Sequence, residues 1–350
     1  MSEYKYSELK QELVFCIRNG RYRQGDLLES EAALQKRFRL SRNTVRQALS
    51  ELANEGFISR HRGKGTIVAN TNPGSSRKVA LVLYNVALML NPVTADMIRG
   101  IDEALASENY TLDVLAGNRD WSGEKIRSLF DTYAGILIGA AEMDEALLQE
   151  FLKSSVPCVF LKNYRSDYRD RTWRIDFEAA GMMAAEHLIS TGVTDLGVIY
   201  TSPQLGITGE FLNGVRRVCL ENGTKLRSAN VIVADEQNRP ETMEKMNAML
   251  TSGQAPGGVV CFTDTFARML QECAELLNIA VPSKLAITGC NNSEISRSWP
   301  VALTTLQIPI RELGCAGAGE LLRRIRGERP GEPVLLKPEL IVRESSGGVK

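Results

Sequence analysis

Residues 40–49 read LSRNTVRQAL, and this stretch decides the fold of the N-terminal region. Ser41 is a favourable N-cap for a helix that begins at the next residue. The apolar side chains recur at the i, i+3, i+4, i+7 spacing of a buried helix face: Val45, Ala48, Leu49 and Leu52. The other side chains are polar or basic and share the opposite, leading face: Arg42, Asn43, Thr44, Arg46 and Gln47. The stretch predicts an amphipathic helix with a positively charged first turn.

Two further helices are predicted upstream of this stretch. Residues 6–19 place apolar side chains on one helical face, and Ser30 is a suitable N-cap for a short helix over residues 31–38. A short helix, a tight turn and a second helix form the helix-turn-helix motif. In that motif the second helix enters the major groove of DNA with its N-terminus first.

The residue types of residues 41–47 suit contact with DNA. Helix amides and Thr44 can donate to phosphate oxygens, Arg42 and Arg46 can bind guanine or phosphate, and Asn43 or Gln47 can read adenine. The alternative for the two arginines is a solvated helix face without a partner. A basic wing beside the helix favours DNA contact.

The wing is predicted from residues 56–69, which read GFISRHRGKGTIVA. This stretch indicates two short strands around a turn in which Gly63 and Gly65 permit a tight backbone. Arg60, Arg62 and Lys64 make the end of this hairpin basic, as contact with the DNA backbone or the minor groove requires.

Residues 4–69 resemble the GntR family of bacterial winged-helix regulators. The matching motifs are GDLL at 25–28, Ser30-Glu31, LSRNTVRQAL at 40–49, Leu52, EGFI at 55–58 and GKGT at 63–66. The resemblance implies a DNA-binding set: Ser41, Arg42, Asn43, Thr44, Arg46, Gln47, Arg60, Arg62, Gly63, Lys64 and Gly65. Two departures are Glu29 in place of a usual Pro, and Ala32 in place of an Arg that helps to hold DNA. We therefore expect a different operator sequence.

The charge distribution agrees with one DNA-binding end. Residues 1–77 contain 14 Lys and Arg against 8 Asp and Glu, an excess of six positive charges. Since the whole chain contains 42 of each class, the remainder carries the opposite excess. We expect no membrane segment, because the longest apolar run, residues 79–90, is too short to span a bilayer. The seven scattered cysteines form no CxxC pair, so we expect a cytoplasmic protein without disulfides or a zinc site.

Residues 70–77 read NTNPGSSR and predict a linker between a winged-helix domain, residues 1–69, and a larger domain, residues 78–350. Beyond the linker, strand-like runs alternate with helical stretches, which indicates βαβ units. The predicted strands are residues 79–84, 111–115, 135–138, 158–161, 196–200, 231–233, 259–262 and 285–288. Overall the fold class is α/β: an α+β winged helix plus a two-lobed core of parallel sheets.

Residues 78–345 resemble the LacI-type effector-binding core, which is itself similar to periplasmic sugar-binding proteins. The matching motifs include IRGIDEA at 98–104, GILI at 135–138, Thr263-Asp264, ITG at 287–289, LTT at 303–305 and LIVRES at 340–345. The resemblance implies an N-lobe of about residues 78–174 and 307–327 and a C-lobe of about 176–304 and 332–345. It also implies hinge crossings near 174–176, 304–308 and 327–333, a small molecule bound between the lobes, and a homodimer on a palindromic double-stranded DNA operator. A GntR-like reader with a LacI-like sensor is the layout of the AraR-type repressors.

The predicted effector-binding residues follow strand ends or hinge positions: Tyr84, Asn85, Trp173, Asp176, Phe211, Asp264, Asn291 and Asn292. Phe211 replaces an arginine that clamps sugar hydroxyls in sugar-binding members, and Asn291-Asn292 replaces Asp-Asp. Trp173 could stack on a ligand or serve in lobe packing. The effector is therefore predicted as a sugar or related metabolite, with two alternatives: a non-sugar metabolite, or a sensor that has lost ligand binding.

We expect no catalysis and no cofactor or metal. The sequence has no Gly-rich phosphate loop, no GxSxG and no HExxH, and it contains only two histidines. A solute-binding protein is the less favoured alternative, because a winged helix precedes the sensor and residues 1–10 show no secretory leader.

Overall fold

The computed structural model describes residues 2–18, 20–54, 57–61, 65–69, 77–83, 92–116, 121–139, 145–154, 156–162, 172–201, 206–297 and 300–347. The chain divides into two compact units, each discontinuous in sequence. The first unit comprises residues 1–161 and 314–332, and the second comprises residues 162–313 and 333–350. Among the described residues, no helix is both long enough and apolar enough to cross a membrane.

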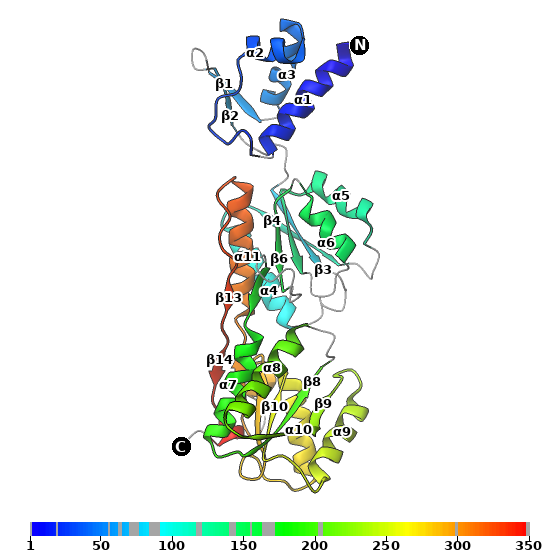
Figure 1. The fold of residues 1–350 in the computed structure, drawn as a ribbon, viewed down its shortest axis with the longest axis vertical. Helices are drawn as coiled ribbons and strands as arrows, with labels where there is room; N and C mark the ends of the chain where they lie inside the picture. The colour runs from blue at the N-terminus through cyan, green and yellow to red at the C-terminus, as the bar shows by residue number, and fades with distance from the viewer. Residues whose placement is uncertain are drawn as a thin grey trace. The chain divides into compact units, whose positions relative to one another are not determined.

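The first unit begins with a small domain whose three helices pack against a two-stranded hairpin (Figure 1). Its elements are α1 (Ser2–Arg18), α2 (Glu31–Phe38), α3 (Arg42–Asn54), β1 (Ile58–His61) and β2 (Gly65–Val68). Residues from Leu9 to Val68 form one apolar cluster, which contains Leu13, Leu34 and Leu49 at 0% exposure. The three helices and the wing strands occupy the predicted positions, and this domain has its own core.

The α/β part of the first unit contributes the parallel strands β6-β5-β3-β4 to a six-stranded sheet in the order β13-β7-β6-β5-β3-β4, where β7 is Thr172–Ile175 and β13 is Leu335–Leu336. Its strands are β3 (Lys78–Leu83), β4 (Thr111–Ala116), β5 (Gly135–Gly139) and β6 (Cys158–Leu161), and its helices are α4 (Pro92–Ala106), α5 (Gly123–Thr132), α6 (Glu145–Leu152) and most of α11 (Ile310–Ile325). Helix α11 approaches α4 so closely that a Cβ on Gly314 would lie 2.3 Å from the carbonyl oxygen of Met97. Strands β3 and β5 are buried along nearly their whole length, and their sequences are accordingly continuous apolar runs.

The second unit is built on a six-stranded sheet in the order β14-β12-β11-β10-β8-β9, in which only β14 is antiparallel. Its sheet strands are β8 (Asp195–Tyr200), β9 (Lys225–Val233), β10 (Gly258–Cys261), β11 (Ala286–Cys290), β12 (Thr304–Gln307) and β14 (Glu339–Ile341). Its helices are α7 (Phe177–Ser190), α8 (Gly206–Glu221), α9 (Arg239–Thr251) and α10 (Asp264–Leu276), with short 3-10 turns η3 (Glu294–Ser296) and η4 (Glu344–Ser346). Helices α7 and α8 form one packed pair, and α9 and α10 form another (Figure 1).

Three strands can be compared with the expected strands, lobes and hinges. Strand β9 begins at Lys225, six residues before the predicted start, and a register shift interrupts its pairing with β8. Strand β7 pairs in parallel with β13, and both are strands of the same six-stranded sheet as β3, β4, β5 and β6. Residues 304–307, predicted as a hinge crossing, form strand β12 between β11 and β14.

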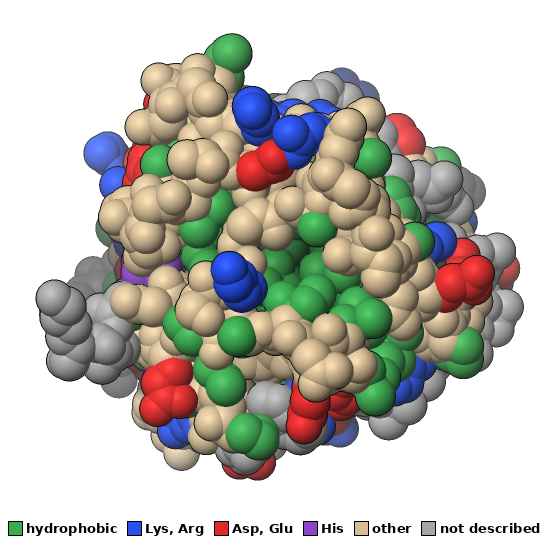
Figure 2. Space-filling view, turned by 90° about the horizontal axis from the view of Figure 1, so that it is seen from below, with side chains coloured by type: hydrophobic (Ala, Val, Ile, Leu, Met, Phe, Trp, Pro, Cys, Tyr) green, Lys and Arg blue, Asp and Glu red, His purple; other side chains and the backbone are tan. Residues whose placement is uncertain are grey.

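The surface of the second unit has an apolar region. Figure 2 looks onto this unit from below and shows hydrophobic side chains gathered in a shallow hollow, with charged side chains around it. The most exposed large hydrophobic residues described in this unit are Leu220, at 85%, and Leu276, at 72%. Single exposed leucines are common on soluble proteins and need no special role.

A half-buried histidine links α7 to the last residues of the second unit. His187 on α7 shares a hydrogen bond of 2.7 Å with the Ser346 hydroxyl, which lies 2.6 Å from the Thr304 hydroxyl. Burial lowers the pKa of His187. The unfolded chain therefore binds the proton more tightly, and the stability that His187 contributes is present above its unfolded pKa and lost as pH falls through its folded pKa.

We expect the His187→Gln protein, which keeps a hydrogen-bonding side chain without titrating, to lose less stability on acidification. The measurement is the difference in melting temperature between the two proteins from pH 8 to pH 5. That difference should shrink as pH falls through the folded pKa of His187. A difference that stays constant over this range would contradict a titrating role for His187.

Candidate nucleic-acid interface

The start of α3 is built by Ser41, whose side chain caps the helix. Its Oγ accepts a hydrogen bond of 3.2 Å from the backbone N–H of Thr44, and the two hydroxyl oxygens lie 2.8 Å apart. The predicted inward side chains are all buried at 0% exposure: Val45, Ala48, Leu49 and Leu52. The predicted outward side chains are exposed: Arg42, Asn43, Arg46 and Gln47. The helix therefore presents its polar, basic face to solvent, as the interface requires.

Glu31, in the first turn of α2, joins this face to the wing. Its carboxylate lies 3.1 Å from Nε of Arg46, 2.6 Å from Nη2 of Arg60 and 3.9 Å from Nε of Arg42. Arg46 and Arg42 belong to α3, whereas Arg60 belongs to strand β1. Three predicted DNA-contacting arginines from two elements are thus gathered around one acidic side chain. Sequence reasoning had placed Glu31 in the motif without giving it a role.

The wing is an antiparallel hairpin in which Ile58 pairs with Val68 and His61 pairs with Gly65. Gly65 has φ of +96°, a conformation that favours glycine, as predicted for a tight turn. Residues 26–28 extend the hairpin, because Leu28 N–H donates to Thr66 and Val68 N–H donates to Asp26. Arg62, Gly63 and Lys64 lie outside the described residues.

Glu29, which replaces the usual proline, has a structural partner. Its carboxylate is 2.8 Å from Arg37, and Arg37 also lies 3.1 Å from Glu12 on α1. Arg37 further stacks on Phe38, with its guanidinium 4.9 Å from the ring centre. This ion-pair group links α2 to α1, so Glu29 is separate from the arginines around Glu31.

We expect Ser41→Ala to lower the stability of the winged helix by about 1 kcal/mol, because one helix N–H loses its cap. Ser41→Gly should cost only a few tenths of a kcal/mol. Thermal unfolding of both variants measures the effect. If Ser41→Ala weakens DNA binding without loss of stability, its hydroxyl contacts phosphate instead of acting mainly as a cap.

The predicted effector residues that the structure describes all belong to the second unit, because Tyr84 and Asn85 lie outside the described residues. Asp264 follows β10, and Asn291 and Asn292 follow the neighbouring parallel strand β11, so both positions meet at the carboxyl edge of the sheet. Parallel α/β sheets bind small molecules at this edge. The structure therefore brings part of the predicted set together.

Asp264 is already surrounded by donors from its own unit. Its Oδ2 accepts hydrogen bonds from the backbone N–H and the hydroxyl of Ser293, at 2.7 and 2.8 Å, and its Oδ1 accepts one from Thr305 at 2.5 Å. Burial raises the pKa of Asp264, while these hydrogen bonds oppose the rise. The carboxylate therefore joins α10 to β12 and to the loop after β11.

Asn292 belongs to the same network. Its Nδ2 donates to Gln307 at 2.6 Å, and its Oδ1 accepts from Nη2 of Arg343 at 2.6 Å. Asn291 and Asn292 have φ of +103° and +45°, a region that asparagine tolerates better than most residues. Arg343 also donates to the carbonyl of Leu303, a role that its place in the sequence did not reveal.

The remaining candidates are buried or act as caps. Asp176 accepts a hydrogen bond of 2.9 Å from the N–H of Ala179 and so caps α7, while Trp173 is 2% exposed in β7. Phe211 is fully buried and packs edge-to-face on Phe262 with ring centres 5.2 Å apart. Phe211, predicted to replace an arginine of sugar-binding members, is thus an aromatic ring inside the second unit.

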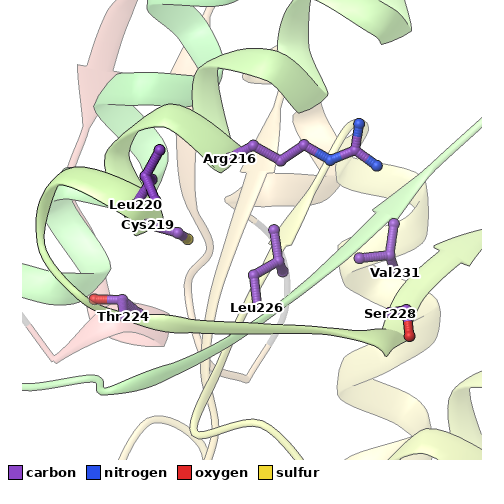
Figure 3. A pocket seen from close by; sticks show the side chains of 7 residues that line it. All are labelled: Arg216, Cys219, Leu220, Thr224, Leu226, Ser228 and Val231. Atoms are coloured by element: carbon purple, nitrogen blue, oxygen red, sulfur yellow. The ribbon is translucent and has the colours of Figure 1, made fainter.

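A separate surface groove of about 530 Å³ lies between α8 and β9. Figure 3 shows its lining side chains, with Arg216 extending from α8 above the strand. The lining is Arg216, Cys219, Leu220, Thr224, Leu226, Ser228 and Val231. None of these residues was predicted to bind effector, so the groove is distinct from the predicted site. In the part of the chain that the structure describes, no group of three His, Cys, Asp or Glu side chains is placed to hold a metal.

Comparison with known proteins matches two separate segments of the chain. Residues 5–68 match the model of the bacterial regulatory proteins of the gntR family, and residues 185–346 match the periplasmic binding protein-like domain. An arabinose metabolism transcriptional repressor of Halalkalibacterium halodurans is 25% identical over 99% of this chain and 98% of that protein. The PurR repressor of Actinobacillus pleuropneumoniae serotype 3 is 27% identical over 73% of this chain and 77% of its own length.

Solved structures agree with the fold. A transcriptional regulator CelR bound to cellobiose has a TM-score of 0.67 and 23% identity, over 87% of this chain and 91% of that chain. The transcription regulator GntR from Chromobacterium violaceum has a TM-score of 0.65 and 23% identity, over 77% of this chain and all of the other.

Proposed function

We propose that this protein is a transcriptional regulator, in which a winged helix that matches the gntR family model reads an operator and a small molecule bound by the periplasmic-binding-protein-like core controls operator affinity. Control by repression is favoured, because the two relatives named above are both called repressors. The protein would act in the cytoplasm as a homodimer on a palindromic operator, because two-fold operators match two-fold dimers.

The observation that carries DNA binding is the cluster of exposed arginines on α3 and β1. Arg42, Arg46 and Arg60 lie around one carboxylate and keep further N–H groups for DNA, since each guanidinium has five. The capped N-terminus of α3 adds the partial positive charge of the helix dipole at the same place. These features match the docking of a recognition helix and a wing.

The experiment is a fluorescence-anisotropy titration of the protein against double-stranded DNA from its own promoter region, with unrelated DNA of equal length as control. We expect the promoter DNA to bind 10³-fold or more tightly than unrelated DNA at physiological salt. Light scattering of the protein alone and of the complex tests the dimer. Equal affinity for both DNAs would refute a sequence-specific regulator.

We propose that the effector is a sugar or a related metabolite. The relatives support this class, since one acts in arabinose metabolism and another regulator is bound to cellobiose. The proposed binding region is the carboxyl edge of the second unit, near Asp264 and Asn292, because parallel α/β sheets bind small molecules at this edge.

A second candidate is a sensor that no longer binds a sugar. Phe211 is fully buried where a sugar clamp is usual, and Asp264 and Asn292 are hydrogen-bonded within their own unit. This arrangement favours a less hydroxylated metabolite or a ligand-independent dimerisation domain.

A thermal-shift screen separates the two, because a ligand that binds only the folded state raises the melting temperature. The probes are L-arabinose, D-xylulose and cellobiose, and a set of uncharged and acidic metabolites without sugar rings. A sugar that raises the melting temperature and changes operator affinity supports the first candidate. If no sugar does either at millimolar concentration, the second candidate holds.

A further inference from the structure

Glu31 lies at the centre of the DNA-contacting arginines. Its side chain is 27% exposed, whereas those of Arg46 and Arg60 are 55% and 37% exposed. Glu31 belongs to α2, Arg46 to α3 and Arg60 to β1, so one carboxylate connects three consecutive elements of the domain. An isolated surface ion pair contributes little to stability, and a carboxylate this close to DNA is electrostatically unfavourable. The Glu31 carboxylate therefore serves neither to stabilise the fold nor to attract DNA.

We infer that Glu31 is a positioning residue that couples the recognition helix to the wing. Two guanidinium groups drawn to one carboxylate would repel each other without it, and each would sample more rotamers. Ordering such long side chains on DNA costs entropy, so an ion pair formed beforehand reduces that cost. The inference rests on the proposed DNA-binding function.

The geometry leaves the arginines able to bind DNA while they contact Glu31. Arg46 donates to Glu31 through Nε at 3.1 Å, so this contact does not use its two Nη groups. Arg60 donates through Nη2 at 2.6 Å, which leaves its Nη1 and Nε. The Nη pair of Arg46 therefore stays available for bidentate binding of guanine or phosphate, whereas Arg60 can contact DNA through Nη1 or Nε. The carboxylate and DNA therefore need not compete for the same N–H groups.

The same carboxylate also opposes binding at the wrong sequence. Glu31 repels phosphate wherever the arginines do not make their full set of contacts, and specificity commonly uses such a repulsive element. Removal of its charge should therefore change affinity for operator and for unrelated DNA in opposite directions. A residue that served only to stabilise the fold would change both in the same direction.

The first test is the Glu31→Gln protein, with Glu29→Gln as the matched control. Both substitutions remove one negative charge from the same short segment, but Glu29 contacts Arg37 and none of the three arginines. For Glu31→Gln we expect the ratio of operator to unrelated-DNA affinity to fall about tenfold, and affinity for unrelated DNA at low salt to rise about twofold. For Glu29→Gln we expect an unchanged ratio. Glu31→Asp should recover part of the lost ratio.

The second test is a double-mutant cycle on the operator. When Glu31 is present, the combined effect of Arg46→Ala and Arg60→Ala on operator affinity should differ threefold or more from the product of the two single effects, because both arginines act through Glu31. In the Glu31→Gln background the same two substitutions should be additive. Melting temperatures of all variants show whether the winged helix stays folded.

Each outcome bears on one claim. If the unchanged protein does not distinguish operator from unrelated DNA, the proposed function fails and the inference fails with it. If the unchanged protein is specific but Glu31→Gln behaves as Glu29→Gln, only the inference is overturned. Additivity of the arginine substitutions in the unchanged protein would also overturn it. If Glu31→Gln unfolds the domain, the Glu31→Asp protein and the arginine cycle in the unchanged protein still decide the question.

Discussion

The Gly214→Ala protein will unfold its second unit at a temperature about 6–12 °C below that of the unchanged protein. A Cβ on Gly214, in α8, would lie 2.1 Å from the carbonyl oxygen of Glu178 and 2.9 Å from the backbone nitrogen of Met182, both in α7. Because these obstacles are backbone atoms, no rotamer change relieves them and the helices must separate. Overpacking of this kind costs about 3 kcal/mol or more, which corresponds to that temperature range for a unit of this size.

The control is Gly209→Ala on the same helix. A Cβ there would meet nothing within 4 Å, so the added methyl group should be neutral or stabilise the helix by up to about 1 kcal/mol. Differential scanning calorimetry of the two variants measures the contrast. Equal melting temperatures for both would show that α7 and α8 can separate without cost.

Gly181 on α7 provides a reciprocal check, since its Cβ would lie 2.0 Å from the carbonyl oxygen of Phe211. We expect Gly181→Ala to be as destabilising as Gly214→Ala, and the double variant to cost less than the sum. The first substitution already opens the contact that the second would break.

The Arg46→Ala protein will bind its operator about 5- to 150-fold more weakly, a loss of about 1–3 kcal/mol. Arg46 is exposed on the leading face of α3, where it forms an ion pair with Glu31, so its removal leaves no cavity. The substitution should therefore weaken DNA binding and change the free energy of unfolding by no more than about 0.5 kcal/mol.

The pattern of the loss identifies the contact. If Arg46 reads a base, affinity for unrelated DNA will stay the same and preference at one operator position will relax. If it binds phosphate, affinity will fall uniformly and the slope of log affinity against log salt will decrease by about one. The exposed Arg21, outside the interface, is the matched control, because Arg21→Ala removes the same charge. A variant that unfolds would assign Arg46 a structural role.

The winged helix could be predicted well from sequence because its signals are local. The i, i+3, i+4, i+7 spacing from Val45 to Leu52 and the cap at Ser41 each involve neighbours within one helix, and both were confirmed. The role of Glu31 could not be predicted, because its three arginine partners are 11 to 29 residues away. Only the packing of α2 against α3 and the wing brings them together.

In the second unit, too, the contacts at the predicted site could not be predicted from the sequence. The positions of Asp264 and Asn292 after two strands followed from the alternating pattern. Their partners did not, since Thr305 and Arg343 are 41 and 51 residues further along the chain. Strand β12 was not among the predicted strands, since its burial depends on the strands on both sides of it.

The discontinuous units also set an order of events during synthesis. The winged-helix core uses residues 9–68 alone, so it can form as soon as that segment has left the ribosome. The first unit lacks residues 314–332 until nearly all of the second unit has been made. At 5–20 residues per second, this interval lasts roughly 10–50 s. A nascent chain therefore passes through a stage in which its winged helix can be folded while the α/β core is still incomplete.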